Sequence, residues 1–215
     1  MKFLDLHTHQ FGSENGIFSL TPEFEIPDSR YFSAGLHPWF LKEDWRENVK
    51  KILEIAKNPR CLAIGESGFD RLKGPEILVQ KEAFQSQAEV AATLGIPLIL
   101  HCVKGHDLLL EFLKREKYLP NIIWHGFNQN PRLVNQLLDF PVSFSFGKAL
   151  LIPDSNAAHW LKSCPLDRIF LETDDSGLEI YSIYQAASLL LQLSEEDLGN
   201  LVKENWNRIS NRKIA

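Results

Sequence analysis

The stretch FLDLHTHQ, residues 3–10, decides how this chain begins to fold and what its first strand carries. A short apolar run leads directly into two histidines. Because side chains alternate between the two faces of a strand, His7 and His9 point to one side and Thr8 to the other. Two neutral imidazoles on one face are half of a metal site, although the same spacing also occurs on half-exposed strands that bind nothing. The rest of the chain has to decide between these interpretations.

The composition is that of an ordinary globular α/β protein, with 44% hydrophobic and 24% charged residues among 215. This length suits one domain, and we expect residues 1–215 to form a single one. The longest apolar runs, such as IPLIL at 96–100, are far shorter than the roughly 20 residues of a membrane-spanning helix, so we expect no membrane segment. The net charge of −5 argues against non-specific coating of nucleic acid, which usually needs a basic surplus.

The N-terminus and the cysteines both favour the cytoplasm. One lysine precedes an apolar strand, without the long apolar segment and small-residue cleavage site of a secretory signal. The three cysteines lie far apart and form no C-x-x-C pair: Cys61, Cys102 and Cys164. Such spacing is typical of reduced thiols in an intracellular protein, and we interpret them as structural.

Short apolar runs alternate with segments of helical periodicity along the whole chain. We predict strands near 3–7, 31–36, 61–65, 97–101, 121–125, 141–146 and 168–172. We predict helices near 43–57, 76–94, 106–117, 131–138 and 155–163, with a helical tail over 182–210. This alternation indicates a parallel sheet covered by helices, either open or closed into a barrel. No G-x-G-x-x-G motif follows the first strand, which disfavours a nucleotide-binding open sheet.

Residues 11–30 break this rhythm. Two prolines and two glycines favour a loop or a short extended ribbon over a helix there. Since a complete eight-unit barrel usually takes about 250 residues, we expect one βα unit to be missing or shrunken in this segment.

Residues capable of metal and acid–base chemistry follow almost every predicted strand. They are His7, His9, His37, Glu66, His101, His125 and Asp174. Any one of them alone could be a packed histidine or a helix cap. Parallel strands, however, deliver their carboxyl ends to one edge, where α/β proteins build their sites. The recurrence therefore predicts a common site, and His37, which precedes Pro38, is expected to face the substrate or support the ligands.

The order of these motifs resembles the TatD family of metal-dependent hydrolases, within the amidohydrolase-like barrel group. The motifs are His7-Thr8-His9, Gly35-Leu36-His37-Pro38, Gly65-Glu66-Ser67-Gly68-Phe69-Asp70, His101, His125-Gly126-Phe127 and Glu172-Thr173-Asp174. Fainter similarities lie in QKEAFQSQ at 80–87 and ENWNRI at 204–209. The resemblance implies a TIM-like (β/α) barrel, here shortened or distorted, with about seven parallel strands.

The resemblance also implies a centre of two divalent metal ions, from among Zn, Mn, Mg, Co and Ni. Carried over, one ion would be held by His7, His9, Glu66 and Asp174, and the other by Glu66, His101 and His125. Asp174 and Glu66 would be the catalytic residues, with Asp174 orienting a metal-activated water and accepting its proton. His37 and Lys104 are the expected substrate contacts.

The implied function is a divalent-metal-dependent phosphodiesterase or deoxyribonuclease, acting as a monomer on a phosphodiester, possibly DNA. One departure weakens phosphate recognition: the family's arginine after the fourth-strand histidine is Val103 here, with Lys104 beside it. Two alternatives stay open. One is a metal-dependent hydrolase of a small C–N, ester or lactone substrate, and the other is a metal-binding protein that has lost catalysis.

Overall fold

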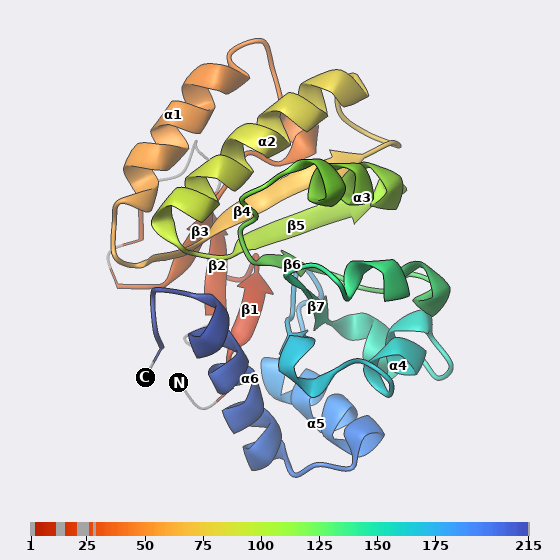
Figure 1. The fold of residues 1–215 in the computed structure, drawn as a ribbon. Coiled ribbons are helices and arrows are strands. Elements are labelled where there is room, and N and C mark those ends of the chain that lie inside the picture. Colours follow the sequence, from red (N-terminus) through yellow and green to blue (C-terminus); the bar gives the residue numbers. More distant parts are fainter. Residues whose placement is uncertain (1–2, 12–15, 21–25, 28, 215) are drawn as a thin grey trace.

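The computed structural model describes residues 3–11, 16–20, 26–27 and 29–214. Its centre is a parallel eight-stranded sheet in which each strand pairs with the next one along the chain. The strands are β1 (Asp5–Thr8), β2 (Gly16–Leu20), β3 (Phe32–Ala34), β4 (Cys61–Asp70), β5 (Leu98–Val103), β6 (Ile122–Trp124), β7 (Val142–Phe146) and β8 (Ile169–Leu171). Figure 1 shows the strands at the centre with helices around them. The predicted TIM-like α/β barrel is confirmed.

The strand count is eight and not about seven, because β2 lies inside the segment that was predicted to be a loop or ribbon. Its residues GIFSL are largely buried, and Phe18 and Leu20 align with Phe32 and Ala34 of β3. What is reduced in this unit is the helix, since the described residues between β2 and β3 form none. A five-residue apolar strand suffices to continue the barrel wall, so the short segment keeps the sheet complete.

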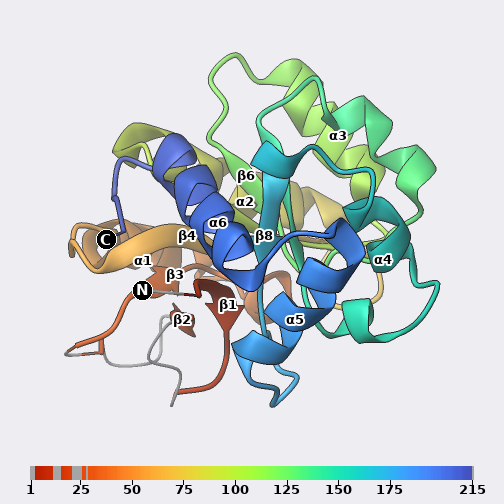
Figure 2. The same cartoon turned by 90° about the horizontal axis from the view of Figure 1, so that it is seen from below.

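In the described part of the chain, six α-helices cover the outside of the sheet. They are α1 (Trp45–Ala56), α2 (Ile77–Leu94), α3 (His106–Arg115), α4 (Asn156–Leu161), α5 (Ile180–Leu191) and α6 (Glu195–Ile209). Helices α1 and α2 pack against β4, whereas α5 and α6 pack against β8 on another side of the barrel (Figures 1 and 2). Helix α2 ends as predicted, with Gly95 in the left-handed conformation at φ 63°.

Five short 3₁₀ turns complete the described secondary structure: η1 (Pro38–Phe40), η2 (Pro131–Leu133), η3 (Asn135–Leu137), η4 (Lys148–Leu151) and η5 (Leu166–Arg168). Two of these, η2 and η3, replace the helix predicted over 131–138. Backbone hydrogen bonds in this segment close over three residues, as from the Leu137 N–H to the Val134 carbonyl, and this gives 3₁₀ turns. The predicted tail over 182–210 is also two helices. Gln192 adopts φ 56°, and Ser194 then caps α6 by accepting the Asp197 N–H.

The barrel closes between β1 and β8 at the residues of the predicted site. Asp174 N–H donates to the His7 carbonyl at 2.9 Å, and His9 N–H donates to the Asp174 carbonyl at 3.2 Å. Below this seam, the buried Asp5 carboxylate accepts hydrogen bonds from the Thr173 N–H at 2.9 Å and hydroxyl at 2.6 Å. Backbone closure therefore fixes three candidate ligands relative to one another before any side chain is considered.

Strand β4 is twice as long as predicted. It continues past Glu66 to Asp70, and all ten of its residues are buried. The extension is possible because Gly68 has no side chain: a Cβ there would lie 1.9 Å from the His101 carbonyl oxygen of β5. Glu66 therefore lies within the strand instead of at its end, and Asp70 reaches the level of the site.

Two buried glutamines of α2 hold the strand ends in place. Gln87 Oε1 accepts the Leu36 N–H at 2.7 Å, next to His37, and Gln80 Oε1 accepts the Asp70 N–H at 2.8 Å. These amides satisfy backbone groups where the sheet ladder ends. The glutamines of the QKEAFQSQ segment are thus a structural link between the helix layer and the site.

Candidate metal centre

The Glu66 carboxylate lies at the centre of the histidine cluster, and its two oxygens face different groups. Glu66 Oε2 lies 3.2 Å from His7 Nε2 and 3.4 Å from His9 Nε2. Glu66 Oε1 lies 2.8 Å from His125 Nε2 and 3.1 Å from His101 Nδ1. One carboxylate thus stands between two pairs of imidazoles.

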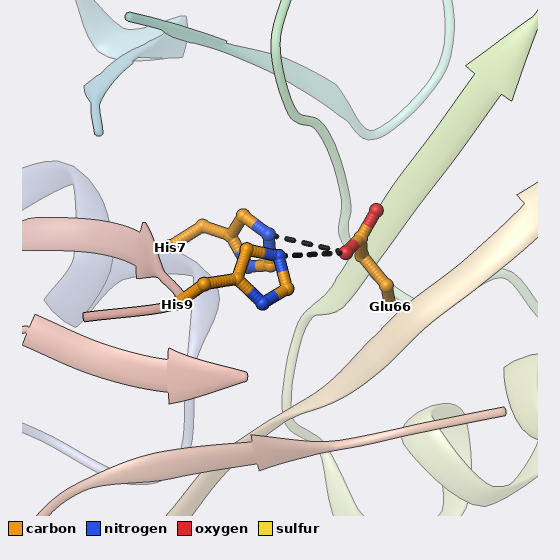
Figure 3. Close-up of side chains that lie close together, drawn as sticks. All are labelled: His7, His9 and Glu66. Atoms are coloured by element: carbon orange, nitrogen blue, oxygen red, sulfur yellow. Dashed lines mark ion pairs between the residues drawn. The ribbon is translucent and has the colours of Figure 1, made fainter. Parts of the chain in front are cut away.

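The first group gathers around the seam between β1 and β8. Figure 3 shows His7 and His9 extending from the end of β1 toward the same oxygen of Glu66. Asp174 Oδ1 lies 3.6 Å from His7 Nε2 and 3.5 Å from His9 Nε2. The backbone of Asp174 is left-handed at φ 51°, a conformation that Asp and Asn adopt more readily than most residues.

The second group is built by β3, β5 and β6. His101 lies on β5, His125 directly follows β6, and His37 follows β3 with its Nε2 3.4 Å from Glu66 Oε1. The rings of His37 and His101 are 4.3 Å apart between centroids. The seven predicted strand-end residues therefore gather in one cluster, with the Glu66 carboxylate at its centre.

The surroundings of His7 show that these residues suit a cation. The His7 side chain is fully buried, and neither ring nitrogen has a hydrogen-bond partner of acceptable geometry among the described residues. An unpaired buried polar group costs about 1–3 kcal/mol unless a ligand satisfies it. Three sets of atoms could hold an ion: His7, His9 and Glu66; His7, His125 and Asp174; His37, Glu66 and His101. Imidazole and carboxylate together suit Zn²⁺ and neighbouring divalent metals.

The carboxylates and imidazoles of this cluster shift one another's pKa values. Burial by itself would raise the pKa of Glu66, but His125 and His7 outweigh it and hold that pKa well below its usual range. Burial would lower the pKa of His125, but the Glu66 and Glu172 carboxylates raise it well above the usual value. Without a cation the carboxylates are therefore neutralised by protonated imidazole, and a bound cation would take over that role.

His37 differs from the other histidines of the cluster in its backbone contact. Its Nδ1 accepts the Trp39 backbone N–H at 3.1 Å. In a neutral ring the proton then resides on Nε2, which faces Glu66 and acts as a donor. Burial lowers the pKa of His37 despite the opposing effect of Glu66, which favours the neutral ring. This geometry suits hydrogen bonding better than metal ligation at Nε2.

A cavity of about 220 Å³ opens above the cluster. It is lined by His9, Ser19, Leu20, Gly35, His37, Trp39, Phe40, Glu66, His101, His125, Asp174 and Asp175. The predicted substrate contact Lys104 is exposed and lies outside this lining. Two described lysines contact residues of this lining: Lys148 pairs with Asp175 at 2.9 Å, and Lys73 lies 3.9 Å from the centre of the Trp39 ring.

Two buried carboxylates near the cluster belong to motifs noted in the sequence, but no role was predicted for them. Glu172 Oε1 lies 3.5 Å from His125 Nδ1, and Asp70 Oδ2 lies 3.2 Å from His101 Nε2. The period of two along a strand was the available signal for Asp70, because residues 66, 68 and 70 share a face. It was missed because the predicted strand ended at residue 65.

Asp5, at the base of the seam, gives the stability of the metal-free protein a pH dependence. Burial raises its pKa from 3.8 to about 6, although the hydrogen bonds from Thr173 oppose this. The folded protein then holds this proton more tightly than the unfolded chain, so the contribution to stability is present below pH 3.8 and is lost as the pH rises through about 6. Between pH 4.5 and 7.5 we expect the free energy of unfolding of wild type to fall by about 2 kcal/mol more than that of Asp5→Asn.

Urea unfolding of the chelator-treated proteins at both pH values checks this. Asp44→Asn is the matched control, since Asp44 is exposed and its side chain makes no capping hydrogen bond. Equal pH dependence of wild type and Asp5→Asn would contradict the assignment.

The fold and the site together define a class: a parallel β/α barrel whose strand ends carry histidines and carboxylates that could hold a metal ion, as in metal-dependent hydrolases. The family model described as TatD related DNase matches residues 15–209, and the chain belongs to this family. The similarity predicted from the motif order is confirmed.

The individual relatives agree with this assignment. A 3'-5' ssDNA/RNA exonuclease TatD from Erwinia tasmaniensis is 31% identical over 69% of this chain and 59% of its own length. An uncharacterized metal-dependent hydrolase from Haemophilus influenzae is 26% identical over 73% of this chain and 63% of its own. The chain thus spans about six tenths of these relatives. The crystal structure of the TatD homolog YJJV from Escherichia coli K12 has the same fold, with a TM-score of 0.79, 19% identity and 98% coverage of both chains.

Proposed function

We propose that residues 1–215 form a single hydrolase domain that uses two divalent cations to cleave a phosphodiester, with single-stranded DNA as the substrate we favour. The observation that carries this proposal is that the two oxygens of Glu66 face different pairs of imidazoles. Oε2 faces His7 and His9, and Oε1 faces His101 and His125. A carboxylate shared between two imidazole pairs is the arrangement that a bridging ligand requires. His7, His9, Glu66 and Asp174 would hold one ion, and Glu66, His101 and His125 the other.

The remaining roles follow from position. Bound divalent cations lower the pKa of a nearby water and stabilise charge on phosphate oxygens. Asp174, which is partly exposed to the cavity, would orient the water and take its proton as the water oxygen bonds to phosphorus. The bond to the leaving oxygen would break as Asp174 passes that proton on to the leaving oxygen. His37, with its proton on Nε2, would donate a hydrogen bond to a phosphate oxygen, and Lys104 stays a predicted outer contact for the phosphate backbone.

The cavity favours a chain end over the middle of a polymer. Its volume of about 220 Å³ is below the roughly 300 Å³ at which sites for drug-sized ligands begin. A nucleic acid could therefore place only a terminal group among the histidines, while its neighbouring bases would lie on the rim. Trp39 and Phe40, which are 43% and 52% exposed, offer rings on which such bases can stack. The relative named as a 3'-5' exonuclease for ssDNA and RNA is consistent with this choice.

The experiment is a hydrolysis assay after removal and replacement of the metal. We expect chelator-treated protein to be inactive and protein restored with Mn²⁺ or Zn²⁺ to shorten single-stranded DNA from an end. Double-stranded DNA should be cut more slowly because its ends are paired. The assay follows end-labelled oligonucleotides, with a small chromogenic phosphodiester, a lactone panel and an amide panel run in parallel.

The panel separates the proposal from its alternatives. Cleavage of lactones or amides alone would replace it with C–N or ester hydrolysis, which the absence of an arginine at Val103 favours. No hydrolysis by protein shown to carry two ions would indicate a metal-binding protein without catalysis.

The described helices are all too short or too polar to span a membrane. Cytoplasmic location and a monomeric state stay predictions.

A further inference from the structure

Asp70 is a buried carboxylate beside the centre that has no role in the function proposed above. It lies at the end of β4 and is only 3% exposed. Its Oδ2 accepts the indole N–H of Trp39 at 2.6 Å and lies 3.2 Å from His101 Nε2. Its Oδ1 accepts the backbone N–H groups of Leu72 at 2.8 Å and Lys73 at 3.0 Å. Four contacts thus fix one side chain in place.

Both ring nitrogens of His101 face carboxylates, and the competition between them decides which nitrogen carries the proton of the neutral ring. A carboxylate only accepts hydrogen bonds, so Asp70 holds a proton on His101 Nε2, whereas Glu66 would hold one on Nδ1. Glu66 Oε1 lies 3.1 Å from Nδ1 but has a closer donor in His125 Nε2, at 2.8 Å. The single proton of a neutral His101 ring is therefore expected on Nε2, beside Asp70, and Nδ1 keeps its lone pair. Ligating histidines commonly have a partner of this kind on the nitrogen that does not face the ion.

We infer that Asp70 is a positioning residue that holds His101 in the Nε2–H tautomer and thereby presents Nδ1 as a ligand for the second cation. This inference rests on the two-cation function proposed above. Asp70 also joins the rim to the centre, because the same oxygen that contacts His101 anchors the exposed Trp39 indole. The alternative is a purely structural role, in which Asp70 only caps the turn at Leu72 and Lys73.

Asp70→Asn distinguishes the two roles. The amide oxygen of Asn can keep both turn N–H groups, which places the NH₂ group where Oδ2 stood. That NH₂ is a donor that faces both His101 Nε2 and the Trp39 indole N–H. The indole loses its acceptor, and His101 must accept at Nε2 and carry its proton on Nδ1 instead. A protonated Nδ1 cannot bind a cation, whereas the turn and the fold are preserved.

The experiment has two readouts besides activity. Long-range ¹H–¹⁵N NMR of metal-free protein, at a pH where the His101 ring is neutral, reports its tautomer, and calorimetric titration with Mn²⁺ reports binding of each ion. We expect wild type to hold the Nε2–H tautomer, and Asp70→Asn to switch to Nδ1–H and to bind the second Mn²⁺ about 10- to 100-fold more weakly. Asp107→Asn is the matched control, since that carboxylate is exposed and pairs with Arg71. Trp39→Phe removes the indole donor to Asp70 and keeps the Asp70 carboxylate, so it should leave the His101 tautomer unchanged. This variant shows what loss of the indole hydrogen bond does by itself.

An Nδ1–H tautomer in the wild-type protein would overturn the inference even if the variant does not fold. So would Asp70→Asn that binds both ions as tightly as wild type. The two proposals fail differently: wild type with the Nε2–H tautomer that binds no second Mn²⁺ would refute the two-cation function while supporting the role of Asp70.

Discussion

Glu66→Gln is expected to reduce bound metal from two ions to at most one and to lower metal-dependent hydrolysis by about 10³-fold or more, the equivalent of several kcal/mol of lost stabilisation. The amide keeps one oxygen, so only one of the two imidazole pairs retains an acceptor. The negative charge that both pairs share is lost altogether. Elemental analysis after dialysis gives the metal content, and steady-state rates on the best substrate give the loss of activity.

A second readout uses the metal-free protein. Burial lowers the pKa of His125, and the Glu66 and Glu172 carboxylates raise it above its usual value. Removing one of these charges should therefore lower the pKa of His125, which NMR titration measures directly. Glu82→Gln serves as the control, because Glu82 is exposed and pairs with Arg46 outside the cavity. Two ions bound with unchanged affinity in Glu66→Gln would rule out a bridging carboxylate.

Asp174→Asn is expected to lower kcat by about 10²- to 10⁴-fold, the usual contribution of a positioned acid or base. The fold should survive. Asn adopts φ 51° as readily as Asp, and the bonds that close the barrel here come from the backbone. Substitution by Ala is less informative, since it would add backbone strain to the chemical loss.

Asp154 provides a control matched in both chemistry and conformation. It has φ 59°, is highly exposed and lies away from the cavity lining. Asp154→Asn should therefore match wild type in rate, metal content and thermal stability. A normal kcat in Asp174→Asn would show that the proton acceptor is another group.

Several features of the fold could be predicted because they are local. Apolar runs of four to six residues marked most strands, and Gly95 marked the end of α2 because a left-handed residue is needed there. The strand β2 was missed since its GIFSL run lies between turn-forming residues, and its burial depends on Phe32 and its neighbours in β3. The length of β4 was also underestimated, because it depends on the close approach of β5 at Gly68.

The sequence alone determined which residues could carry the chemistry and in what order, because histidines and carboxylates after apolar strands must gather at one edge of a parallel sheet. Only the tertiary structure decided how they are paired. Glu66 meets His7 only because the barrel closes, and Asp70 reaches His101 only because β4 pairs with β5 in this register. Both contacts join residues far apart in the chain. Hydrogen bonds are directional over about 3 Å, and no periodicity along a chain specifies distances of that size.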